Sequence, residues 1–110
     1  MRILLCIVVM LSGQLNPQMG KPVVHLGVHQ DVINVTFGGK LLELANAPPV
    51  VHLPVVPPKQ DDAGNPWTID IKNLGPNAVT VTGKGEFSVR DAVGQTLHID
   101  SDGSSYRLKR

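Results

Sequence analysis

The chain has 110 residues, few aromatic side chains and a formal net charge of +1. This length corresponds to one domain, or to a small domain with an arm, and it excludes a large single-domain enzyme. Since only Phe37, Trp67, Phe87 and Tyr106 are aromatic, the core must consist mostly of Val, Ile and Leu, which favours a β-rich fold. Basic residues cluster only at the C-terminus, so the sequence does not predict nucleic-acid binding.

Residues 1–20 form an apolar N-terminal segment that has two alternative interpretations. Arg2 is followed by an apolar run from Ile3 to Leu11 and then by the small residues Ser12 and Gly13, which is the layout of a short secretory signal. The run is too short to span a bilayer. The alternative is a retained strand or arm that docks on a neighbouring copy, because an apolar run left in water would tend to aggregate.

Between residues 21 and 56 the sequence predicts short strands separated by breakers. The predicted strands cover 23–29, 32–37, 40–44 and 50–56. Gly38-Gly39 supplies a tight turn after the second strand, because glycine reaches positive φ without steric cost. Pro54 cannot donate a hydrogen bond to a strand ladder, so the last of these strands is expected at a sheet edge.

Residues 57–66 are predicted to be an exposed loop, since Pro, Asp, Gly and Asn disfavour regular pairing. After the loop, apolar and polar residues alternate from Trp67 to Lys72 and from Val79 to Thr82, which predicts a β-hairpin. Further strands are predicted at 87–90, 95–100 and 105–109, with a turn at 101–104 before the last strand.

These patterns predict a single all-β domain over residues 21–110. We expect about eight short antiparallel strands in a small sandwich or β-prism-like module. The alternation along the strands also predicts the structural core. Its expected members are Trp67, Ile69, Ile71, Val79, Val81, Phe87, Leu97, Ile99, Tyr106 and Leu108.

Four histidines raise the question of a metal site, and their spacing argues against one. His25 and His29 lie in a predicted strand, where residues four apart share a face but are separated by roughly 13 Å. His52 and His98 could converge on one of them, but no Asp, Glu or Cys accompanies them at ligand spacing. Cys6 is the only cysteine, which excludes an internal disulfide and a cysteine-rich zinc site. We therefore expect no metal and no other cofactor.

Two other motifs have a structural explanation that is simpler than a functional one. The string from Asp100 to Ser104 resembles the start of a calcium loop, but the bidentate Glu is missing, and Asp-Gly between strands predicts a hairpin turn. Asn34-Val35-Thr36 matches a glycosylation sequon in a predicted strand, where we attribute the match to chance. The carboxylates form no acid/base pair, and no G-x-S-x-G motif or Cys-His pair is present, so we expect no enzyme.

The order of motifs from about residue 31 to residue 108 resembles the small β-module of tailed-bacteriophage tail fibre, tailspike and appendage proteins. The matching motifs are Asp31-Val32-Ile33, Val51-His52-Leu53-Pro54, Gly64, Ile71-Lys72-Asn73-Leu74-Gly75, Val79-Thr80-Val81, Gly94-Gln95-Thr96-Leu97, Ser101-Asp102-Gly103 and Tyr106. Three features depart from the module. Asp91 replaces an apolar residue, Tyr106 replaces a Trp, and the stretch LLELANAPP lengthens the first half.

The resemblance implies a module without catalytic activity, often a homotrimer, that displays loops and binds a receptor or a neighbouring subunit. We therefore expect a structural or binding module of a virion or an extracellular appendage. The expected partners are other copies of the chain, other virion or appendage subunits, and a cell-surface receptor or glycan. The small size of the domain and its edge strand at 50–56 also favour self-association. The alternative is a secreted bacterial β-sandwich that binds a glycan or a surface partner, with residues 1–13 removed.

Overall fold

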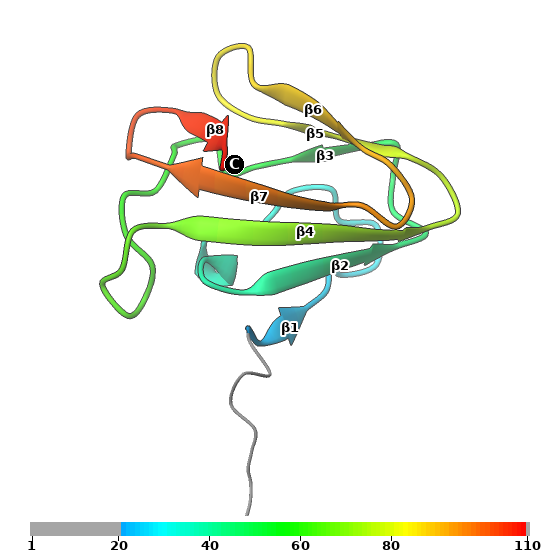
Figure 1. The fold of residues 1–110 in the computed structure, drawn as a ribbon, viewed down its shortest axis with the longest axis horizontal. Helices are drawn as coiled ribbons and strands as arrows, with labels where there is room; N and C mark the ends of the chain where they lie inside the picture. The colour runs from blue at the N-terminus through cyan, green and yellow to red at the C-terminus, as the bar shows by residue number, and fades with distance from the viewer. Residues whose placement is uncertain (1–20, 110) are drawn as a thin grey trace, which may run out of the picture.

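The computed structural model describes residues 21–109, which form two β-sheets packed face to face as a small sandwich (Figure 1). The expected all-β fold is confirmed: this part of the chain contains eight strands, one short 3₁₀ helix and no α-helix. Within these residues no helix has the length and apolar character needed to cross a membrane. The predictions made for residues 1–20 lie outside the described residues.

Five strands form one sheet, in the order β1-β2-β4-β7-β8, and three form the other, in the order β3-β5-β6. The bounds are β1 (Val23–Val24), β2 (Leu41–Ala45), β3 (Val50–His52), β4 (Thr68–Gly75), β5 (Val79–Thr82), β6 (Ser88–Asp91), β7 (Thr96–Ser101) and β8 (Tyr106–Leu108).

The strand pairing is mixed, which corrects the expectation that the strands are antiparallel. β1 pairs with β2, β2 with β4, and β3 with β5 in parallel, whereas β4–β7, β5–β6 and β7–β8 are antiparallel. β2 and β4 are parallel because the chain crosses to the other sheet and back through β3, and β3 and β5 are parallel because it crosses and returns through β4. After such a crossing the next strand of the sheet runs in the same direction as its neighbour, which makes the pair parallel.

The predicted hairpin from Trp67 to Thr82 is wrong. β4 and β5 follow each other in the sequence but belong to different sheets, because β4 already has β2 on one side and β7 on the other. The connection is a corner between the two layers. It begins at Gly75, whose φ of 92° is accessible to glycine, and continues through a cis peptide bond to Pro76.

A buried asparagine holds this corner together. The Asn73 side chain donates to the backbone oxygens of Asn77 and Asp91 and accepts a hydrogen bond from the Gly75 N–H, at 2.8, 2.9 and 2.8 Å. These bonds connect the end of β4 to the end of β6 and so join the two sheets. An Asn in a predicted turn therefore has a role in tertiary structure as well as in the turn.

Two predicted strands in the first third of the chain are much shorter than expected. Only Val23–Val24 of the predicted strand 23–29 pairs with a neighbour. In the predicted strand 32–37, Val32 makes an isolated bridge to His52, and Val35–Phe37 form the 3₁₀ helix η3. The helix starts here because the Asn34 side chain accepts a hydrogen bond from the Thr36 N–H, an arrangement that competes with strand pairing.

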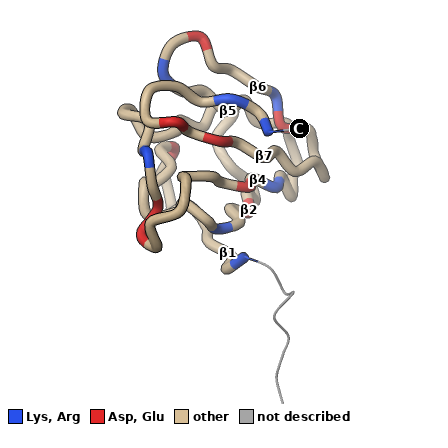
Figure 2. The backbone as a smooth tube through the Cα atoms, turned by 60° about the vertical axis from the view of Figure 1, so that its left-hand side comes forward, with Lys and Arg blue, Asp and Glu red and all other residues tan. Residues whose placement is uncertain are grey.

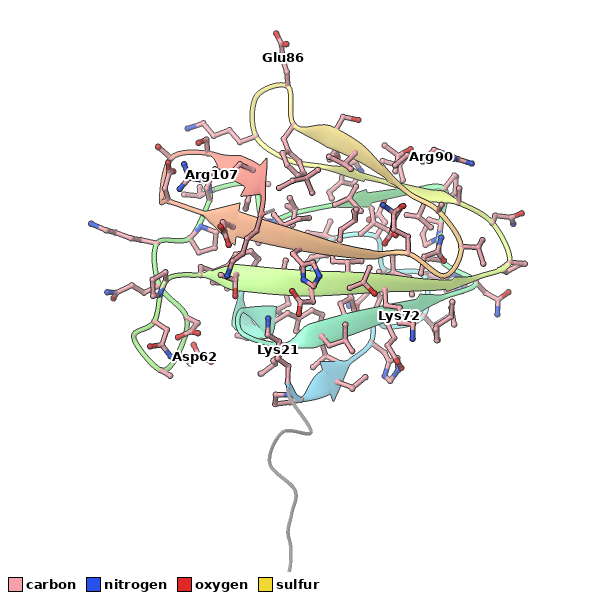
Figure 3. The ribbon with its side chains drawn as sticks, viewed as in Figure 1. Lys21, Asp62, Lys72, Glu86, Arg90 and Arg107 are labelled. Carbon is pink, nitrogen blue, oxygen red and sulfur yellow. The ribbon has the colours of Figure 1, made fainter. Side chains whose placement is uncertain are left out.

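The core lies between the two sheets. Of the expected core residues, Phe87 and Leu108 are half-buried and pack against the core, and the others are buried. Five more buried apolar residues come from the first half of the chain: Ile33, Leu42, Leu44, Val51 and Leu53. Charged side chains such as Lys72, Glu86 and Arg90 point away from the sandwich (Figure 3).

Candidate functional site

The four histidines are exposed, and three of them face different polar partners. His25 Nε2 is 3.4 Å from a Glu43 oxygen, and His52 Nδ1 is 2.8 Å from the Thr82 hydroxyl oxygen. His98 Nδ1 is 2.7 Å from Asp70 Oδ1. Within residues 21–109, no group of three His, Cys, Asp or Glu side chains is placed to hold a metal ion.

The most connected charged cluster lies on the outer face of the five-stranded sheet, where Asp70 on β4 is directly opposite His98 on β7. Asp70 accepts from Lys21 Nζ at 2.8 Å and is bonded to His98 through its other oxygen. Burial by itself would raise the pKa of Asp70, but the hydrogen bonds and charges of Lys21 and His98 outweigh burial and lower it. The adjoining hollow is lined also by Thr68, Asp100 and Lys109.

The acidic string at residues 100–104 forms a turn. Asp102 Oδ1 accepts from the backbone N–H groups of Ser104 and Ser105, each at 2.8 Å. These bonds to backbone and to the Ser104 hydroxyl lower the pKa of Asp102 to about 2. The carboxylate therefore caps the β7–β8 turn. Asp61 makes the same kind of contact in the loop 57–66, with the N–H groups of Ala63 and Asn65.

An apolar surface lies beside β3, at one edge of the three-stranded sheet. Val32, Val50, Val55 and Val56, which we call the valine surface, expose 51%, 37%, 83% and 75% of their area. Val32 and Val55 also line a groove of about 470 Å³ together with His52, Leu53, Thr82, Gly83 and Lys84. We single out the valine surface because exposed apolar side chains beside an apolar groove are typical of an interaction site.

The expected edge strand at 50–56 is shorter than predicted, because β3 ends at His52. β3 is an edge strand of its sheet. Part of its open side is covered within the chain, since the His52 N–H donates to Asp31 and the Ile33 N–H donates to the His52 carbonyl, both at 2.7 Å. Pro54 follows the strand and accepts a hydrogen bond from the Tyr106 hydroxyl at 2.6 Å.

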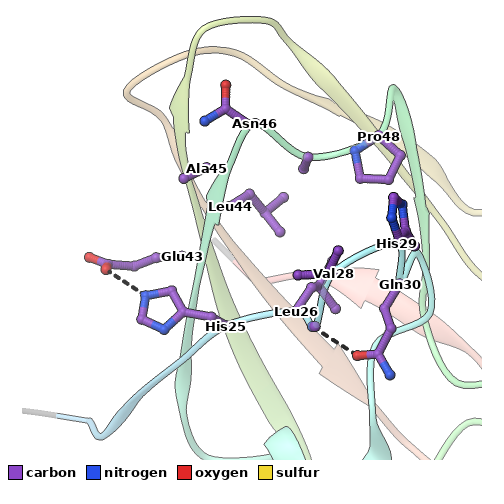
Figure 4. A pocket seen from close by; sticks show the side chains of 12 residues that line it. His25, Leu26, Val28, His29, Gln30, Glu43, Leu44, Ala45, Asn46 and Pro48 are labelled. Atoms are coloured by element: carbon purple, nitrogen blue, oxygen red, sulfur yellow. Dashed lines mark hydrogen bonds and ion pairs between the residues drawn. The ribbon is translucent and has the colours of Figure 1, made fainter.

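A second hollow, of about 370 Å³, lies at the end of β2 (Figure 4). One wall is the segment 25–30, which follows β1, and the other is the segment 43–48. Leu26, Leu44, Ala47 and Pro48 make it largely apolar, and His25, Glu43 and Asn46 provide polar groups at its rim. In the described chain the two non-glycine residues with positive φ are His29 and Asn46, one on each wall.

One buried carboxyl group has no hydrogen-bond partner among residues 21–109. Asp91, at the end of β6, is 0% exposed, and neither side-chain oxygen accepts a hydrogen bond. Burial raises its pKa to about 7. The sequence marked this position as unusual, because the resembled module has an apolar residue there, but the burial of Asp91 could not be read from the strand pattern alone.

Figure 2 shows acidic and basic residues spread over strands and loops on the side in view. Comparison of the chain with protein-family models, with curated proteins and with solved structures gives no match. The valine surface and the hollow at β2 are therefore the features on which a functional proposal can rest.

Proposed function

We propose that this protein is a non-enzymatic structural and binding module of a virion or an extracellular appendage, and that it works as a homo-oligomer. The observation that carries the proposal is the valine surface. Three of its valines expose half or more of their area next to an apolar groove at a sheet edge. Covering such an apolar surface with a partner lowers the free energy, because apolar area is removed from water.

The geometry of the surface suits a second copy of the chain as the partner. Val50 and His52 project from the same face of β3, and the groove continues from His52 to Val55. The surface combines protruding valines with a hollow, so it can be complementary to itself, as the interfaces of symmetric oligomers are. A trimer is the form that the resemblance to appendage modules implies.

The charged cluster at Asp70 supports a structural module better than a hydrolase. His98 and Asp70 are oriented like the base and the carboxylate of a catalytic triad, but a triad also needs a nucleophile in reach of the base. Among the described residues, the hollow beside this pair is lined by no serine or cysteine. Its one hydroxyl side chain, Thr68, makes no hydrogen bond to His98, and Lys21 neutralises the carboxylate. We therefore interpret the cluster as an ion-pair network on a sheet face.

Light scattering coupled to size exclusion of the full chain, at several concentrations, tests self-association. We expect a trimer for the wild-type protein. The double variant Val55→Ser/Val56→Ser should dissociate at concentrations where the wild type is associated, because the buried apolar area is reduced. Val93→Ser is the matched control, since Val93 is 52% exposed in the turn between β6 and β7. A monomer at every concentration contradicts the proposal.

The alternative function is a secreted β-sandwich that binds a glycan or a surface partner. The apolar run that follows Arg2 favours it, because this run has the layout of a secretory signal. Mass spectrometry of the mature N-terminus separates the two functions. A protein that begins near residue 14 supports secretion, and one that retains the run supports the appendage module.

A further inference from the structure

The edge of the five-stranded sheet is incomplete beside the end of β2. β1 pairs only with Leu41 and Leu42, whereas β2 continues to Ala45. The Leu41 N–H donates toward β1, to the Pro22 oxygen, and the Lys40 oxygen and the Asn46 N–H bond toward β4. The direction of backbone groups alternates along a strand, so Leu41, Glu43 and Ala45 face the β1 side. The Glu43 N–H faces Val24, where β1 ends, and the Glu43 carbonyl and the backbone groups of Ala45 lie beyond that end.

The hollow described above occupies this place, and we call it the β2 gap. It lies beside Glu43–Ala45, and apolar side chains such as Leu26 and Ala47 form its interior. The wall opposite β2 is held by a tight turn, in which the Gln30 N–H donates to the Gly27 oxygen and the Gly27 N–H donates to Gln30 Oε1. Strand addition uses two features, and both are present here: unpaired backbone groups at a strand edge and an apolar hollow beside them.

The chain itself contains a segment with the matching chemistry. The run from Ile3 to Leu11 is apolar and rich in Ile and Val, and it carries no proline, glycine or charge. Such a run readily pairs as a strand and presents side chains that fill apolar hollows. Nine residues separate Leu11 from Lys21, the first described residue, and when extended they span roughly 30 Å.

We propose that the β2 gap is the docking site for the Ile3–Leu11 segment of a neighbouring copy. The segment would pair with the Glu43 carbonyl and the backbone of Ala45 and insert an aliphatic side chain against Leu26 and Ala47. The proposal rests on the proposed self-association. A neighbouring copy is the donor because its body would also cover Val28 on the wall of the gap and Val23 on β1, which expose 85% and 48% of their area.

The only cysteine of the chain makes the contact testable in the full-length protein. Cys6 lies in the middle of the docking segment. Val28→Cys and Ala47→Cys each place a second cysteine on a wall of the β2 gap, and Ala63→Cys places one in the exposed loop 57–66 as the control. Val28 is exposed, so its replacement by cysteine leaves the core unchanged. Each variant is oxidised with glutathione disulfide and analysed by denaturing electrophoresis and peptide mass spectrometry.

We expect intermolecular links from Cys6 to the cysteine at position 28 or 47 in about tenfold excess over links to position 63, because docking raises the local concentration of the thiol. Equal linking to all three positions, or linking of Cys6 mainly to another Cys6, would overturn the proposal. So would a link within one chain, which would place the segment in its own gap, or a mature protein that lacks Cys6. Association that persists without these links would leave the proposed function standing and refute only the docking site.

Discussion

The two ends of β4 differ in how their buried polar groups are hydrogen-bonded. At its beginning, Trp67 and Tyr106 pack edge to face with ring centres 6.2 Å apart, and Phe87 packs on Tyr106 with ring centres 6.0 Å apart. Both polar atoms of this cluster are bonded to backbone oxygens. The Trp67 indole N–H donates to Val35 at 2.8 Å, and the Tyr106 hydroxyl donates to Pro54.

At the other end of β4 two polar side chains are buried, Asn73 on β4 and Asp91 at the end of β6. Asn73 makes three hydrogen bonds to backbone, whereas Asp91 makes none through its carboxyl group. Each unmet polar group in a core costs free energy, and an ionised one costs more. The aromatic end should therefore stabilise the fold at every pH, and the Asp91 end should make its stability depend on pH.

The largest effect is expected at the aromatic end. Trp67→Ala should lower the free energy of unfolding by about 3–5 kcal/mol, because it removes a fully buried ring and leaves a cavity. Urea titration followed by circular dichroism measures the change. Trp67→Phe keeps most of the ring but loses the bond to Val35, so its loss should be clearly smaller. An equal loss in both variants would mean that the indole N–H, and not the packing of the ring, matters most.

The second-largest effect is a loss of folding stability with rising pH, and it comes from Asp91. Below about pH 4 the carboxyl group is neutral in the folded and the unfolded chain. As the pH rises toward 7, the unfolded chain loses this proton while the folded chain keeps it, since burial raises the folded pKa to about 7. The stability contributed by the neutral form is therefore lost between pH 4 and 7.

Asp91→Asn tests this sign, because the amide is neutral at every pH. The variant should be more stable than the wild type at pH 8. The difference between their free energies of unfolding should shrink by on the order of 2–4 kcal/mol as the pH falls to 4. Asp62→Asn, at an exposed position in the loop 57–66, is the control and should parallel the wild type. A constant difference between Asp91→Asn and the wild type across this range would contradict the assignment.

The smallest effect is expected for Tyr106→Phe. The ring and its contacts with Trp67 and Phe87 remain, and only the hydrogen bond to the Pro54 oxygen is lost, at a cost of about 1 kcal/mol. Burial raises the pKa of Tyr106 to about 12, so the wild-type hydroxyl should not ionise before the protein unfolds in base. Ultraviolet titration of the folded protein measures this, and ionisation near pH 10 would show that the hydroxyl is accessible.

The sequence predicts most of what depends on alternation along a strand. The alternating apolar residues of β4, β5 and β7, from Ile69 and Ile71 to Leu97 and Ile99, are buried because alternate residues of a strand face the same side, whichever strand is the neighbour. The turn at Asp102 was also predictable, since its carboxylate bonds to backbone N–H groups only two and three residues away.

The tertiary structure decided most of the strand partners, and the β7–β8 pair, joined by the turn that Asp-Gly predicts, is the exception. Trp67–Lys72 and Val79–Thr82 have the local pattern of a hairpin, yet β4 pairs with β2 and β7, and β5 pairs with β3 and β6. A strand exposes the same backbone groups to any neighbour, so pairing depends on which layer can bury its apolar face and on the crossings that bring distant segments together. The burial of Asp91 and the β2 gap follow from the same choice of partners, which is why the local sequence did not reveal either of them.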